Sequence, residues 1–157
     1  MRTRLATWLV VVGMAASVTG CNTMQSTGEK MMAEKSLYDR LGGKPAITAV
    51  VDDFVGRVAA DNRINGKFAN ANIPRLKMML VDQICQASGG PCTYTGRDMR
   101  TTHAGMGITS EQFDALVGDL VATLKKFKVP DREQKELLSV LGPMKGDIVE
   151  KPLASSR

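Results

Sequence analysis

The chain has 157 residues with 43% hydrophobic residues and a formal net charge of +5, and this length predicts one domain of ordinary size. Residues 1–20 carry two arginines and no acid, so their removal would leave a charge of about +3, too small to indicate a nucleic-acid-binding protein. Only 4% of the residues are aromatic. We therefore expect an aliphatic, methionine-rich core.

The N-terminus has the layout of a secretory signal. Arg2 and Arg4 precede an apolar run that is too short for a comfortable membrane span. The run ends at Val18-Thr19-Gly20-Cys21, which resembles the lipobox of bacterial lipoproteins, where the chain is cut before the cysteine and the thiol is lipidated. We expect a lipoprotein signal peptide over 1–20 and lipidation of Cys21. The alternative is an ordinary signal peptide or an uncleaved anchor, with a spare thiol.

The polar, methionine-rich stretch that follows has no clear apolar period. It predicts a lipidated flexible tether over 21–35, a domain over 36–150 and a disordered tail over 151–157. The lipid would hold the chain at the cell envelope, facing the periplasm. Asn22 does not resemble the aspartate that marks inner-membrane retention in enteric bacteria, which slightly favours the outer membrane.

Cys85 and Cys92 are the other two cysteines. Export implies an oxidising compartment, so a disulfide between them is predicted, and the intervening Gly89-Gly90-Pro91 is a turn that would bring the thiols together. A metal-binding pair is the alternative, but it has no nearby partners. The gap between the cysteines does not match the Cys-x-x-Cys-His pattern of covalent haem attachment.

The domain begins with two predicted helices. Ser36 is placed to cap a short helix that Gly42-Gly43 stops. Lys44-Pro45 then opens a longer helix, because proline is tolerated in the first turn. One face of this helix is apolar and Val55 lies at its edge, the face itself being formed by Ile47, Val50, Val51, Phe54 and Val58.

Three more helices are predicted further along. Ile73-Pro74 opens one of them, and Thr109 with Gln112 matches a capping box at the start of the next. A turn at residues 128–130 leads to the last helix, which Pro143 is expected to kink. No stretch alternates with period two, so the fold is predicted to be all-α. The apolar faces carry Leu76, Met79, Leu80, Gln83 and Ile84, then Phe113, Leu116, Val117, Leu120 and Leu124, and finally Leu137, Leu138, Leu141 and Ile148.

His103 is the only histidine in the chain. It lies in a glycine-containing stretch, residues 93–107, that predicts a loop with at most a short helical turn. A neutral imidazole is a common ligand for iron and zinc, but a histidine satisfied on a polar turn is the ordinary alternative. Phe68 is an isolated aromatic in a polar connection, where a buried anchor is the default interpretation.

Six short sequence motifs resemble those of the group 1 truncated haemoglobins. They occur in that family's order and span about residues 37–149. They are Leu37–Gly43, Val51–Phe54, Arg75–Lys77, Gly89–Pro91, Tyr94–Gly96 and His103–Thr109. The resemblance implies a two-on-two helical sandwich that encloses haem b. It also implies that His103 is the proximal iron ligand and that Phe68 packs against the haem.

A hydrophobic macrocycle such as haem is held by a histidine that faces an apolar cleft. The apolar residues predicted around His103 therefore agree with this interpretation without the family resemblance. The expected cofactor-binding residues are His103, Phe68, Phe54, Leu76, Met79, Leu80, Ile84, Met99 and Leu116. Plain core packing without a cofactor is the alternative.

Two positions depart from the family pattern. A tyrosine usually follows the phenylalanine matched by Phe54, and a glutamine usually stands four residues after the position of Leu76, both donating hydrogen bonds to bound oxygen. Val55 and Leu80 stand there instead. The distal pocket, formed by Val55, Leu76, Met79 and Leu80, is therefore predicted to be apolar, and tight oxygen retention is not expected.

Met79 stands where some family members place an internal sixth iron ligand. A thioether can bind haem iron, and His/Met ligation raises the reduction potential. Met79 would otherwise simply fill space.

We expect a haem globin that reversibly binds O₂, NO or CO and is a ligand-binding protein rather than a dedicated enzyme. The alternative is a redox protein, His/Met-ligated or five-coordinate, for electron transfer or for NO or peroxide detoxification with an unidentified redox partner. A purely structural lipoprotein would require that haem be absent.

Overall fold

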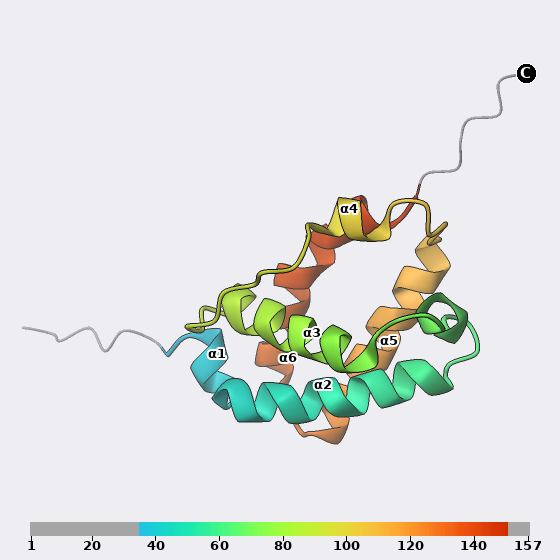
Figure 1. Cartoon of the computed structure of the whole chain (residues 1–157). Coiled ribbons are helices and arrows are strands. Elements are labelled where there is room, and N and C mark those ends of the chain that lie inside the picture. The colour runs from blue at the N-terminus through green and yellow to red at the C-terminus, as the bar shows by residue number, and fades with distance from the viewer. Residues whose placement is uncertain (1–34, 151–157) are drawn as a thin grey trace, which may run out of the picture. The chain divides into compact units, whose positions relative to one another are not determined.

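The structure is a computed structural model that describes residues 35–150 (Figure 1). The predicted signal peptide, Cys21, nearly all of the tether and the C-terminal tail lie outside the described residues. Residues 35–150 form helices and loops without a strand, as the sequence predicts. Among these helices, none combines the length and apolar character that crossing a bilayer requires.

The first helices begin where the sequence places them. α1, Leu37–Arg40, is capped by Ser36, whose hydroxyl accepts a 3.1 Å hydrogen bond from the backbone N–H of Asp39. α2, Gly43–Ala60, starts after a turn in which Gly42 has a φ of 93°, a left-handed conformation that glycine adopts without strain. The turn therefore separates α1 from the long helix that follows.

The middle of the domain contains a short 3₁₀ helix, η1, over Asn65–Phe68, and the long helix α3 over Ile73–Ala87. Asn72 caps α3 by accepting a hydrogen bond from the backbone N–H of Arg75. A loop then leads to α4, Met99–His103, which is the short helical turn expected around the histidine.

The last part of the domain consists of α5, Ser110–Lys126, and α6, Asp131–Leu141. The predicted capping box of Thr109 and Gln112 is present at the start of α5. Pro143 interrupts the final helix as expected, since the chain passes from α6 into the 3₁₀ helix η2, Gly142–Met144, and then into α7, Lys145–Ile148.

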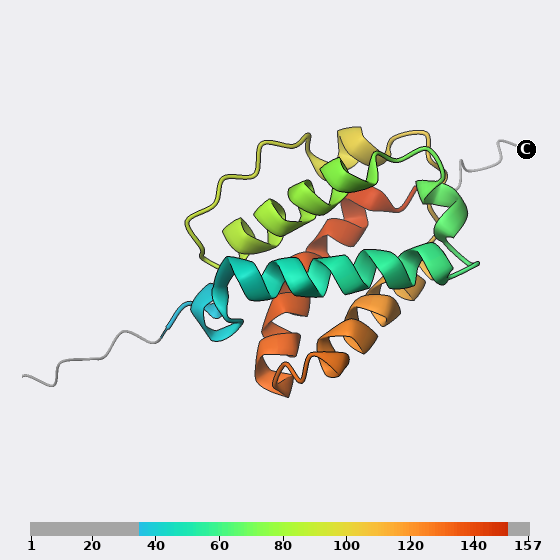
Figure 2. The same ribbon diagram turned by 60° about the horizontal axis from the view of Figure 1, so that its bottom comes forward.

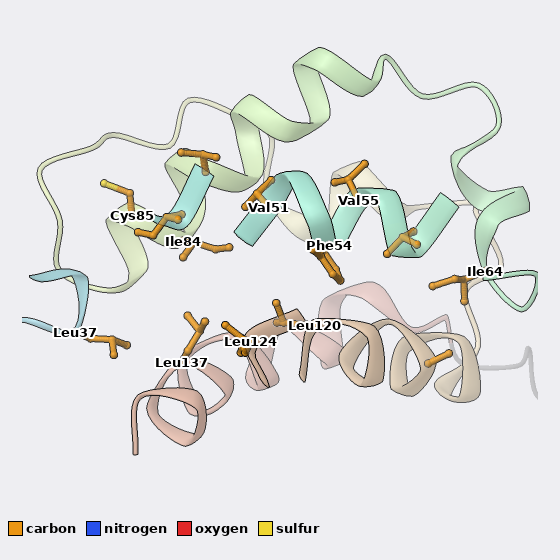
Figure 3. Close-up of a cluster of buried hydrophobic side chains, with 14 residues drawn as sticks. Leu37, Val51, Phe54, Val55, Ile64, Ile84, Cys85, Leu120, Leu124 and Leu137 are labelled. Carbon is orange, nitrogen blue, oxygen red and sulfur yellow. The ribbon is translucent and has the colours of Figure 1, made fainter. Parts of the chain in front are cut away.

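The helices form two layers. α2 packs against both α3 and α5, and it crosses in front of α5 and α6 in Figure 2. The pair α2 and α3 therefore covers the pair α5 and α6, which is the predicted two-on-two arrangement. The side chains of the buried core are aliphatic apart from Phe54 and Cys85, and Figure 3 labels among them Val51, Phe54, Val55, Ile84, Cys85, Leu120, Leu124 and Leu137.

Arg40 holds α1 against the start of α6. Its guanidinium donates hydrogen bonds to Glu133 at 2.6 Å and to Glu136 at 2.5 Å, and the side chains of Arg40 and Glu133 are largely buried. The hydrogen bond from Arg40 lowers the pKa of the Glu133 carboxyl below its usual value. The beginning of the domain is thus attached to the N-terminal part of α6.

Cys85 and Cys92 form a disulfide, which confirms the prediction from the sequence. Cys85 is completely buried near the end of α3, and Cys92 lies in the loop that leads to α4. The bond therefore attaches the loop that precedes His103 to a buried position of the core.

Reduction of this disulfide is expected to lower the free energy of unfolding by about 2–3 kcal/mol, because the unfolded chain regains the entropy of a short loop. Urea unfolding with and without a reductant measures the difference. The double variant Cys85→Ala/Cys92→Ala serves as the control and should not respond to the reductant. Identical midpoints for the oxidised and reduced natural chain would contradict the prediction.

Candidate functional site

A partly open cavity lies between α2, α3, α4 and α5. The empty space inside it and at its open mouth is about 1060 Å³. Within residues 35–150, Gln83 and His103 are the only polar residues that line it, and the other lining residues are aliphatic, aromatic or methionine. An enclosure of this kind favours a large apolar ligand that is oriented by few polar contacts.

The cavity brings together almost all of the residues that the sequence predicts for the site. They come from both helical layers and from the short segments between them. The predicted residues that line it are Phe54, Val55, Phe68, Leu76, Leu80, Ile84, Met99, His103 and Leu116.

Met79 is the exception, because it is not among the residues that line the cavity. Leu76, Leu80 and Ile84 follow one another at four-residue steps along α3 and share one side of that helix. The cavity lining gives no support to a place for Met79 in the distal pocket, so its roles as a pocket residue and as an iron ligand stay predictions.

Gln83 and Met144 are lining residues that the site prediction did not include. The Gln83 amide nitrogen donates to the sulfur of Met99 at 3.5 Å and to that of Met144 at 3.4 Å, so it joins α3 to α4 and η2. The sequence signal for Gln83 was its place on the same helix face as Leu76 and Leu80. Met144 follows a proline in a stretch without helical period, and no sequence signal indicated it.

The His103 ring is oriented by its own helix. Its Nδ1 atom lies 2.7 Å from the backbone carbonyl oxygen of Met99. A carbonyl only accepts, so we assign the proton to Nδ1, which donates this hydrogen bond. The Nε2 atom then keeps a free lone pair, which is the state of an imidazole that can bind a metal ion.

Contacts from other segments hold α4 in place, because a helix of five residues is too short to be stable alone. Asp98 caps it by accepting a 2.8 Å hydrogen bond from the backbone N–H of Thr101, which lowers the pKa of the Asp98 carboxyl. Arg100 pairs with Asp147 at 2.6 Å, attaching α4 to α7, and Figure 1 shows these two elements side by side. The position of His103 is therefore set by the surrounding chain.

Lys67 connects the two segments that carry Phe68 and His103. Its ammonium group donates hydrogen bonds to the carbonyl oxygens of Met106 at 2.6 Å and Gly107 at 3.2 Å, in the loop that follows α4. Gly107 has a φ of 57°, a conformation that suits glycine. We call this contact the Lys67 clasp. Phe68 and His103 also line a second, adjoining cavity that Lys67 borders, so the clasp lies at the edge of the site.

These residues fit a haem group. A porphyrin needs extensive apolar walls, and its metal needs a ligand atom such as the free Nε2 of a neutral histidine. The lining of this cavity provides both.

The family model described as "Bacterial-like globin" matches residues 36–150 of the chain. A group 1 truncated haemoglobin of Mycolicibacterium paratuberculosis is 39% identical over 113 residues, covering 72% of this chain and 83% of the relative. A group 1 truncated haemoglobin of Tetrahymena thermophila is 32% identical over 121 residues, covering 77% of this chain and all of the relative.

Solved structures agree with these sequence matches. The truncated haemoglobin of Tetrahymena pyriformis in its Fe(III) form superposes with a TM-score of 0.72 at 32% identity, covering 74% of this chain and all of that one. The 2/2 haemoglobin of a Synechococcus species, which carries covalently attached haem, superposes with a TM-score of 0.70 at 32% identity, with the same coverage.

Removal of the Lys67 clasp is expected to loosen the loop after His103. Lys67→Met keeps the apolar stem but loses both hydrogen bonds from a charged donor, so the amides of residues 104–109 should exchange with solvent about tenfold faster or more. Hydrogen exchange followed by mass spectrometry measures this. Lys135→Met, an exposed lysine on α6, is the matched control and should leave the loop unchanged. Equal exchange in Lys67→Met and the natural chain would contradict the role of the clasp.

Proposed function

The chain belongs to the group 1 truncated haemoglobins, and from this premise we propose that it is a lipid-anchored, periplasm-facing form of the family with His103 as its iron ligand. As a member, it is a haem-binding globin for small diatomic ligands such as O₂, NO and CO.

The orientation of His103 is the observation that carries the proposal. The ring lines an apolar cavity and is held through Nδ1 by the carbonyl of Met99, which leaves Nε2 for a metal. Haem b supplies the iron centre to which a gas ligand binds. Around it, Phe68 would pack against the macrocycle, and the remaining walls would be Phe54, Leu76, Leu80, Ile84, Met99 and Leu116.

The distal side is proposed to lack a hydrogen-bond donor for the gas ligand. Val55 and Leu80 line the cavity at the positions where the family usually has tyrosine and glutamine. Gln83 is the other polar lining residue besides His103, and its amide N–H groups already contact the sulfurs of Met99 and Met144. A ligand that becomes polar on binding, such as O₂, receives no stabilising hydrogen bond from such apolar walls. We therefore propose fast release of O₂, with CO much less affected.

The redox alternative has less support. Its distinguishing feature is Met79 as a second iron ligand, and Met79 does not line the cavity. A five-coordinate redox role would use the same His103 site, and no contact in the site favours it over ligand binding.

The proposed location depends on the N-terminus and the disulfide. The sequence before Cys21 resembles a lipobox, so we propose the division into a signal peptide over 1–20, a lipidated tether over 21–35, a globin domain over 36–150 and a tail over 151–157. A disulfide persists in an oxidising compartment, which agrees with export to the cell envelope.

Replacement of His103 tests the proposed site. In His103→Gly the affinity for haem should fall by more than about 100-fold. Loss of a residue that only supports a metal ligand typically lowers affinity by at most about 100-fold, so loss of the ligand itself should cost more. The Soret absorbance of the purified protein measures the loss. Free imidazole, which fits the space left by the side chain, should restore a spectrum close to that of the natural chain. A variant that keeps an unchanged spectrum without imidazole would refute the assignment of His103.

Replacement of Val55 tests the apolar distal side. Val55→Tyr restores a hydroxyl donor and is expected to slow O₂ dissociation by about tenfold or more, since hydrogen bonds that involve charged groups contribute roughly 1.5–3 kcal/mol. Val55→Phe adds the same ring without the hydroxyl and is the control. Stopped-flow dissociation rates for O₂ and CO separate the two effects. Slow O₂ release from the natural chain, unchanged in both variants, would mean that another polar group reaches the ligand.

A further inference from the structure

The turn between α5 and α6 presents an aromatic ring among lysines. Residues 125–128 are Lys-Lys-Phe-Lys, and all four are exposed. Phe127 is 40% exposed, and it is one of only two large apolar side chains that are exposed within residues 35–150. We call residues 125–128 the basic turn.

The charge of the basic turn is only partly neutralised. Lys126 pairs with Asp53, and its ammonium group lies 6.0 Å from the centre of the Phe127 ring. Lys125 and Lys128 form no ion pair with any residue in the described part of the chain. Two cations on either side of the exposed ring are therefore available to an anionic surface.

The backbone of the turn carries a lysine at an unfavourable position. Lys128 has a φ of 54°, and it is the only residue other than glycine with a positive φ within residues 35–150. The position follows the C-cap of α5, where glycine usually ends a helix at lower conformational cost. A lysine thus stands at a place where the backbone alone favours glycine.

The basic turn lies at the same end of the domain as its N-terminus. Arg40 of α1 contacts Glu133 in the first turn of α6, and Leu41 and Val129 line one small cavity. α4 and α7 lie at the opposite end, roughly 27 Å away along the run from α6 to α7. In Figure 2 this end, with α1 and the α5–α6 turn, lies at the lower left and α4 lies at the top.

The described chain begins at Lys35, directly before α1 and so at the same end of the domain as the basic turn. If Cys21 carries lipid, the segment from Asn22 to Lys35 joins the bilayer to α1, and covalent geometry limits it to roughly 50 Å at full extension. The end of the domain that holds α1 and the basic turn is then kept within roughly 50 Å of the bilayer.

We propose that the basic turn docks on the anionic phospholipid surface of the membrane that holds the lipid anchor, an inference that rests on the proposed lipidation of Cys21. Lys125 and Lys128 contact lipid phosphates, and the Phe127 ring enters the boundary between headgroups and acyl chains. Each lysine near such a surface strengthens binding about fivefold. In this orientation α4 and His103 lie at the end of the domain away from the bilayer.

The test uses the full chain purified from membranes and reconstituted into two kinds of vesicle, one of phosphatidylglycerol with phosphatidylethanolamine and one of phosphatidylcholine alone. Hydrogen exchange of residues 124–130 should be slower on the anionic vesicles. Lys125→Glu/Lys128→Glu should weaken this protection by at least about tenfold, as should 1 M salt. Phe127→Ser should also reduce it.

Arg75→Glu/Arg97→Glu is the matched control, because it reverses two exposed cations away from the basic turn and should retain the protection. The Soret band of every variant reports a folded domain. The intact mass shows separately whether Cys21 carries lipid.

If the protein is bound to the vesicles but the basic turn has the same hydrogen-exchange rate on both lipids, the docking surface would be refuted, whereas the proposed lipid anchor would not. Lysine-dependent protection in a chain without lipid on Cys21 would support the docking surface and refute lipidation. Protection lost equally in the control variant would also overturn the proposal, because general charge would then explain it.

Discussion

The Nδ1 atom of His103 donates a hydrogen bond to the Met99 carbonyl, and this contact determines which nitrogen of the ring is free for a metal. The bond is made within a helix of five residues, so it persists only while that helix is held by its neighbours. Gln83 contacts Met99 from α3, Arg100 reaches Asp147 on α7, and the disulfide fixes the preceding loop. The chemistry of one imidazole therefore depends on contacts with several separate segments.

The helix α2 serves both the core and the site. Phe54 and Val55 are buried and also line the cavity, so the side chains that stabilise the fold also form the ligand pocket. The identity of residue 55 is thus constrained by packing as well as by the ligand. An apolar residue at this position satisfies packing directly, whereas a buried hydroxyl would need a hydrogen-bond partner.

The sequence predicts the helices well because caps, glycine pairs and apolar periods are local signals, as at Ser36 and Thr109. Its prediction of the cavity lining succeeds where residues repeat at helical steps, as in Leu76 and Leu80. It does not extend to Met79, which follows Leu76 by three residues on α3 but is absent from the lining. The Lys67 clasp and the contacts of Gln83 join residues far apart in the chain, and no local pattern records such contacts.

The clasp also bears on how the cofactor enters and leaves. Phe68 and His103 stand on short segments that face each other, and Lys67 joins these segments at the edge of the site. The long helices α2, α3 and α5 bury the core between themselves and need not separate when those segments part. Local opening of this kind costs less free energy than global unfolding. Breaking the two hydrogen bonds of the Lys67 clasp would therefore let the segments that carry Phe68 and His103 part while the core between the long helices stays packed.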